Sequence, residues 1–114
     1  MTDELGVPVC SRPRIIAVDF DGCLCSNSWP DIGMANLDAI EELKEIQKRG
    51  NWLILWTCRK GKALDDAVAW CAKHQLFFDA VNENMPSVVR QFGEDTRKIY
   101  ADEYWDDKAI RVVV

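Results

Sequence analysis

Acidic side chains stand in two pairs, one near the beginning of the chain and one near its end. Asp19 and Asp21 flank a single phenylalanine, and Asp106 and Asp107 are adjacent. Carboxylates that are held together repel one another and favour protonation, and a bound divalent cation removes this cost. Because Mg²⁺ prefers hard oxygen ligands, the two pairs predict a magnesium site if the fold brings them together.

The same groups are suited to phosphoryl transfer. Beside a bound Mg²⁺, Asp19 can attack phosphorus and form an aspartyl-phosphate. Asp21 can protonate the leaving oxygen and later deprotonate water, and Gly22 permits the sharp turn that carries Asp21 back to the site. Thr57 can hydrogen-bond the transferring phosphoryl group, and Lys98 can offset its negative charge.

The elements that must position these groups are short apolar strands alternating with helices. Residues 15–18 run directly into Asp19, and residues 52–56 run into Thr57, as strands buried on both faces do. We expect strands at 15–18, 52–56, 76–81, 99–105 and 109–114, and helices at 34–49, 62–74 and 86–92. We expect a loose lead-in over residues 1–13 and a loop over residues 23–33, which carry glycine, proline, serine and asparagine.

This alternation predicts an α/β fold in a single domain spanning residues 1–114. A mostly parallel, five-stranded sheet covered by helices follows from the order of elements, and right-handed crossovers make it doubly wound and Rossmann-like. Ligands of such folds bind at the carboxyl ends of the strands, near the switch point in strand order. Asp19, Thr57 and the pair Asp106–Asp107 all lie at such ends.

In its motifs the sequence resembles the haloacid dehalogenase-like (HAD) hydrolases. That family's first motif is an apolar strand followed by Asp-x-Asp-Gly, as in residues 15–22. Its second motif is a strand ending in Thr or Ser, as at Thr57. Its third is a Lys or Arg ahead of the fourth strand, as at Lys98 or Arg97, and its fourth is an apolar strand that ends in acidic residues, as at 106–107. All four motifs occur in order and span nearly the whole chain.

The resemblance implies a role for each motif residue. Asp19 is the expected nucleophile and a Mg²⁺ ligand, and Asp21 is the expected general acid/base, with its backbone carbonyl on the metal. Thr57 is expected to bind the phosphoryl group together with Lys98 or, in its place, Arg97. Residue 106 is the expected direct metal ligand, and residue 107 acts directly or through water. The second acid of the first motif points to phosphatase or phosphomutase chemistry.

The spacing of the motifs leaves no room for the cap domain that many members of the HAD family insert. Only a short loop separates the first motif from the helix at 34–49, and residues 57–98 are used by two helices and a strand. The resemblance therefore implies a cap-less, Mg²⁺-dependent phosphomonoester hydrolase with an open active site. Its substrate is a phosphorylated small molecule or a nucleic-acid end. Cys23 stands where threonine is commonest in the family, and we expect this departure to cost little activity.

Two residues near the motifs have more than one interpretation. Arg59 lies near a helix N-terminus, where anions bind readily, and is either a substrate-phosphate contact or a surface charge. Trp29 follows the first motif and is a candidate for stacking on a substrate base or sugar.

Two other functional classes remain open: a receiver-like phosphoacceptor signalling domain, for which the third strand offers only Asp79, and a catalytically silent HAD-fold binding module.

The composition sets outer limits on function. The net charge of −5 argues against nonspecific binding to nucleic acid or membranes, which repel an acidic surface. Five cysteines fit no common zinc framework and are expected to be reduced thiols. No signal peptide and no apolar run of roughly 20 residues is present, so we expect a cytoplasmic protein. Pairing of an exposed sheet edge in a homo-oligomer stays open.

Overall fold

A computed structural model describes residues 2–4, 6–8 and 12–114 of the chain. Near its beginning, β1 (Thr2–Glu4) and β2 (Gly6–Pro8) pair antiparallel. The expected lead-in thus contains a short hairpin, and residues 1, 5 and 9–11 of it lie outside the described residues.

Four parallel strands form the central sheet, in the order β7-β6-β3-β8. They are β3 (Ile15–Val18), β6 (Trp52–Leu55), β7 (Ala80–Val81) and β8 (Glu103–Trp105). Val18 of β3 lies opposite Leu55 of β6 and opposite Trp105 of β8. The carboxyl ends of these three strands therefore meet at one edge of the sheet.

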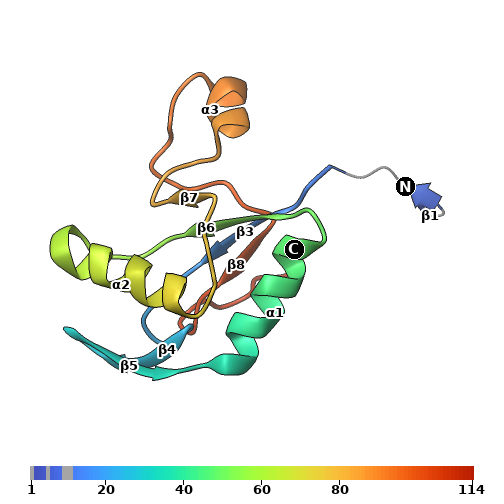
Figure 1. Ribbon diagram of the computed structural model, residues 1–114. Coiled ribbons are helices and arrows are strands. Elements are labelled where there is room, and N and C mark those ends of the chain that lie inside the picture. Colours follow the sequence, from blue (N-terminus) through green and yellow to red (C-terminus); the bar gives the residue numbers. More distant parts are fainter. Residues whose placement is uncertain (1, 5, 9–11) are drawn as a thin grey trace.

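Helices cover both faces of this sheet (Figure 1). α1 (Leu37–Lys48) and α2 (Gly61–Lys73) pack on one face, and α3 (Pro86–Phe92) packs on the other. The chain moves in one direction from β3 through β6 to β7, so right-handed crossovers keep α1 and α2 on the same face. It then returns to the far side of β3 to form β8, which puts α3 on the opposite face. The change of direction between β3 and β8 is the switch point in strand order.

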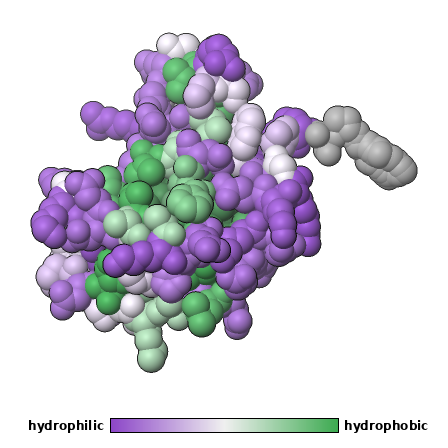
Figure 2. All heavy atoms as spheres, in the orientation of Figure 1, coloured by the Kyte–Doolittle hydropathy of each residue, from purple (hydrophilic) through white to green (hydrophobic). Residues whose placement is uncertain are grey.

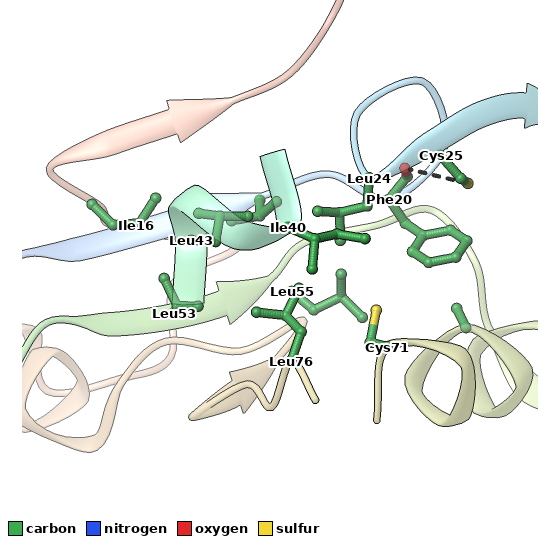
Figure 3. Packing of buried hydrophobic residues seen from close by; sticks show 12 residues of the cluster. Ile16, Phe20, Leu24, Cys25, Ile40, Leu43, Leu53, Leu55, Cys71 and Leu76 are labelled. Atoms are coloured by element: carbon green, nitrogen blue, oxygen red, sulfur yellow. Dashed lines mark hydrogen bonds between the residues drawn. The ribbon is translucent and has the colours of Figure 1, made fainter. Parts of the chain in front are cut away.

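The hydrophobic core lies on both sides of β3, whose four residues are all buried. On one face, side chains of β3 and β6 pack against Ile40 and Leu43 of α1 and Cys71 of α2; Figure 3 shows this packing from close by. On the other face, Ile54 and its neighbours pack against Val88 of α3. Burial on both faces explains why these strands carry continuous apolar runs rather than alternating patterns.

Residues 23–33, expected as a loop, instead begin a second hairpin. β4 (Cys25–Ser28) pairs antiparallel with β5 (Asp31–Ala35). A side chain at Gly33 would collide with Ser26 of the opposite strand, so glycine permits this close pairing. The helix expected from residue 34 begins only at Leu37, because the Asn36 side chain caps it by accepting a hydrogen bond from Ala39 N.

The expected five-stranded sheet has four strands among the described residues. Residues 109–114 form no strand, and their side chains are exposed, because strand propensity forms no strand without a neighbour to pair with. The strand expected from residue 99 begins at Glu103. Ile99 and Ala101, which precede this strand, pack in the core on the side of α3. Tyr100 N donates a hydrogen bond to the side chain of Asn84 rather than to a neighbouring strand.

The surface of the body is largely polar. In the view of Figure 2, hydrophilic residues cover most of the surface, and hydrophobic residues show in separate patches at its centre and toward its lower edge. Among the described residues, no helix combines the length and the apolar character that crossing a membrane would need.

Candidate active site

Three acidic side chains converge where β3 and β8 end. Asp19 follows β3 directly, and Asp106 and Asp107 follow β8. Because the two strands are hydrogen-bonded neighbours, with Asp19 N donating to Trp105 O at 2.9 Å, their ends cannot separate. One carboxylate oxygen from each of the three acids lies within 4.8 Å of the others. Acids that are almost ninety residues apart in the sequence thus form one cluster.

This cluster is electrostatically costly without a cation. Burial raises the pKa of Asp19 above its ordinary value, and the nearby charges of Asp106, Asp21 and Asp107 raise it further. A hydrogen bond from Phe20 N to Asp19 Oδ1, 2.8 Å long, acts in the opposite direction. A divalent cation would relieve this repulsion and favour the charged carboxylates.

The donor set of this cluster fits Mg²⁺. Its three carboxylates are hard oxygen ligands, and octahedral Mg²⁺ holds its oxygens roughly 3 Å apart when adjacent and roughly 4 Å apart when opposite. The three oxygens lie within 4.8 Å of one another, a separation of the same order as this spacing. Burial and the nearby charges of Asp19, Asp106 and Asp107 raise the pKa of the neighbouring Cys23 thiol to about 12.

Gly22 lets the first acidic loop approach the second. Its φ is +81°, a left-handed conformation that favours glycine. A Cβ at this position would lie 2.5 Å from Oδ2 of Asp107 and 2.8 Å from its Cγ. The glycine therefore serves the turn and also leaves space for a carboxylate of the cluster.

Asp21 does not lie in the cluster with the other acids; its carboxylate is held by Arg59. Nε and Nη2 of Arg59 donate to its two oxygens, each at 2.8 Å. Such bidentate pairing is the strongest arrangement of these two groups. The hydrogen bond to Asp21 raises the pKa of the Arg59 guanidinium further.

Arg59 also ties the β4–β5 hairpin to the site. Its guanidinium donates to Pro30 O at 3.3 Å and to Asp31 O at 2.9 Å, both in the hairpin. It lies 5.1 Å from the ring centre of Phe20 and 4.9 Å from that of Trp29. The residue is only 2% exposed, and four of its five N–H groups are engaged. In this arrangement one N–H is left for a substrate phosphate, so the geometry favours a structural role over the expected substrate contact.

Thr57 lies at the end of β6, next to the end of β3, and its orientation is set by Asn82. Thr57 N donates to Oδ1 of Asn82 at 2.8 Å, and Asn82 N in turn donates to Leu55 O. The Thr57 hydroxyl oxygen accepts from Arg59 N at 3.1 Å, which leaves its proton free to be donated. The positive φ of Asn82, +52°, lets its side chain reach back to the end of β6.

Lys98 and its alternative Arg97 are exposed residues on the segment that leads to β8. Among the described residues, neither side chain pairs with an acid of the site. The segment is anchored by the buried Asn84, whose side chain donates to Asp95 Oδ1 at 2.8 Å and accepts from Tyr100 N at 2.8 Å. The structure thus brings together the acids at residues 19, 106 and 107, but it does not add the expected third-motif cation to them.

The fold and this site define a small α/β protein with an acidic centre at the carboxyl edge of a parallel sheet. No family model and no curated protein matches the chain. A solved structure, that of a conserved protein from Bacteroides thetaiotaomicron, is similar to it over 87% of this chain and 79% of that one. The sequences are 38% identical and the TM-score is 0.76. The chain therefore belongs to the same family as this conserved protein.

Proposed function

We propose that the protein is a Mg²⁺-dependent phosphomonoester hydrolase that works through an aspartyl-phosphate on Asp19. The observation that carries the proposal is the convergence of Asp19, Asp106 and Asp107 at the ends of two adjacent strands. A cation would offset the repulsion between these carboxylates, and phosphate esters are the substrates that a site of this kind can both bind and attack.

The two roles of the first acidic loop follow from where its side chains lie. Asp19 is partly exposed and faces the other acids, so its free oxygen can reach a phosphorus atom. Attack forms a bond between that oxygen and phosphorus and breaks the bond to the leaving oxygen, which takes a proton from Asp21. Water then attacks the phosphorus, gives its proton to Asp21, and releases phosphate and Asp19. Because both oxygens of Asp21 accept from Arg59, the side chain must release one of these bonds in order to act.

The remaining expected roles belong to the same proposal. Mg²⁺, held by residues 19, 106 and 107 and by the backbone carbonyl of Asp21, would neutralise the charge of the phosphate. The Thr57 hydroxyl would donate to a phosphoryl oxygen, and Lys98 or Arg97 would approach when substrate binds. The β7-β6-β3-β8 order with helices on both faces agrees with a doubly wound, HAD-type domain without a cap. Cytoplasmic location and oligomerisation stay predictions.

A receiver-like phosphoacceptor domain is less well supported. Receivers need a phosphoacceptor at the carboxyl end of the third strand, which here is β7. Asp79 precedes β7 and accepts hydrogen bonds from Leu53 N at 2.8 Å and from Gln47 at 3.2 Å. It therefore fastens β6 and α1 at the opposite end of the strand from the acidic centre.

The proposal is tested with p-nitrophenyl phosphate and Mg²⁺. We expect turnover that requires Mg²⁺, is lost on adding EDTA, and falls by at least about a thousandfold in Asp19→Asn, which removes the nucleophile. Asp65→Asn makes the same chemical change on the exposed side of α2 and should leave the rate unchanged.

Each other functional class gives a different result in this assay. Phosphorylation of one site per molecule without turnover would support the receiver. Mg²⁺ binding without any reaction, measured by calorimetry, would support the silent binding module. Full activity in Asp19→Asn would refute the assignment of the nucleophile.

A further inference from the structure

A pocket of about 190 Å³ lies between the β4–β5 hairpin and the loop that follows β6. It is lined by Asp21, Asn27, Trp29, Cys58 and Arg59. The hairpin contributes the asparagine and the tryptophan, and the loop contributes the cysteine and the arginine. The hairpin that the sequence did not predict therefore builds one wall of this pocket.

The position of the pocket determines which part of a substrate can enter it. Asp21 forms one side of the pocket, and in the proposed reaction it gives its proton to the leaving oxygen. The phosphate must lie near Asp19 in the acidic centre, so the alcohol part of the ester extends past Asp21. The alcohol part therefore points into the pocket.

The chemistry of the lining favours a flat, uncharged group. The Arg59 guanidinium covers one face of the Trp29 ring, 4.9 Å from its centre, and the side chain is still 60% exposed, which leaves the other face for stacking. Before substrate binds, Asp21 balances the positive charge of Arg59, and four of the five N–H groups of Arg59 are already engaged, so the lining holds little for a second phosphate or a carboxylate. Its volume is below the roughly 300–1,000 Å³ of pockets that enclose whole drug-sized ligands, which suits one ring system rather than a larger molecule.

We propose that this pocket, the ring pocket, binds a flat neutral ring carried by the alcohol part of the substrate. The preferred substrates are then phosphomonoesters of ring-bearing alcohols, such as arylmethanols or nucleosides, rather than of small aliphatic alcohols. This inference rests on the proposed hydrolase function. Stacking on Trp29 supplies the preference, while the acidic centre treats all such esters alike.

The test compares three esters whose leaving groups are all alkoxides of similar basicity: benzyl phosphate, a nucleoside 5′-monophosphate and glycerol 3-phosphate. We expect Trp29→Ala to lower kcat/KM for the two ring-bearing esters by roughly 5- to 150-fold, the range that follows from loss of one base–aromatic stack. For glycerol 3-phosphate the change should be at most about twofold, because no stack is lost. Trp29→Phe should restore most of the loss.

Phe77→Ala provides a matched control. Phe77 is also 60% exposed, but it precedes β7 at the opposite end of the strands from the site, so kcat/KM should not change for any ester. Loss for both ring-bearing esters supports recognition of rings in general, and loss for the nucleotide alone supports the proposal in its nucleoside form.

Two results would overturn the proposal while leaving the hydrolase intact. Equal losses for all three esters would mean that Trp29 only holds the hairpin and Arg59 in place, and no loss for any ester would mean that the pocket stays empty. Absence of hydrolysis of every ester by the unaltered protein would refute the hydrolase function and the ring pocket together.

Discussion

Gly22→Ala tests whether the acidic centre depends on the close approach of its two loops. The substitution places a Cβ 2.5 Å from Oδ2 of Asp107, whereas ordinary contact begins at 3.4 Å. The carboxylate must therefore retreat by about 0.9 Å, the difference between these distances. Ligand positions in a metal site tolerate shifts of only roughly 0.2 Å. We expect Mg²⁺ to bind at least about tenfold more weakly, comparable with the loss of a supporting group around a metal.

The same substitution strains the backbone, and this effect has to be separated from the effect on the metal. An alanine at φ +81° costs about 1–2 kcal/mol of folding stability. Gly50→Ala is the matched control, because Gly50 has φ +95° but a Cβ there would meet nothing within 4 Å. Both variants should lose similar stability in urea denaturation, and only Gly22→Ala should lose Mg²⁺ affinity.

Affinity is measured in two ways, by the Mg²⁺ dependence of ester hydrolysis and by the rise in melting temperature that Mg²⁺ produces. The second readout does not require activity. If Gly22→Ala acts through Asp107, adding Asp107→Ala should cause little further loss, since the two changes remove the same ligand. Wild-type Mg²⁺ affinity in Gly22→Ala, at either readout, would refute the reasoning.

Two further predictions concern stability. Arg59→Met keeps the buried stem of the side chain but removes four donated hydrogen bonds. We expect the free energy of unfolding, measured by urea denaturation, to fall by about 3 kcal/mol. This is the low end for broken buried ion pairs, because the partner carboxylate is 20% exposed. The exposed Arg90→Met should change stability by less than about 0.5 kcal/mol, and equal effects of the two would contradict the proposed anchoring role. Although burial opposes it, hydrogen bonds from Arg12 and from Ile15 N lower the pKa of Asp102 below 3.8. Its stabilising effect is therefore present above pH 3.8 and lost as the pH falls through the lower folded-state pKa. Asp102→Asn should thus destabilise the protein at pH 7 and progressively less as the pH falls below 3.8, and a pH-independent difference would disprove the linkage.

The positions of β3 and β6, and the polar residues that follow them, could be predicted from local sequence. Residues 15–18 and the apolar run from residue 52 are continuous because β3 and β6 are buried on both faces, and burial of this kind leaves a direct mark on the sequence. The periodicity of apolar residues in the helices is an equally local signal, so the approximate order of the main elements was predictable. The hairpin of β4 and β5 was not, because glycine, proline and asparagine mark a turn without showing how its flanks pair.

The last part of the chain shows a limit of such predictions. Residues 109–114 have the composition of a strand, but strand formation depends on a partner with a free edge, and no neighbour pairs with them in the described structure. The composition around residue 99 likewise predicts the start of a strand. In the structure the side chain of Ile99 instead packs in the core beside α3. Strand propensity is a property of the segment itself, whereas strand pairing depends on which neighbouring strands the rest of the fold provides.

By itself the sequence determined which residues are candidates for the proposed chemistry and at which strand ends they lie, since both follow from residue type and from short apolar runs. Only the tertiary structure decided that Asp21 pairs with Arg59 apart from the other acids, that Asn82 orients Thr57, and that Trp29 stands over a pocket. These contacts join residues more than twenty positions apart in the sequence, and their geometry depends on how β3, β6 and the hairpin pack together. Local sequence patterns carry no information about the distances between such residues, because these distances are set only when the whole chain has folded.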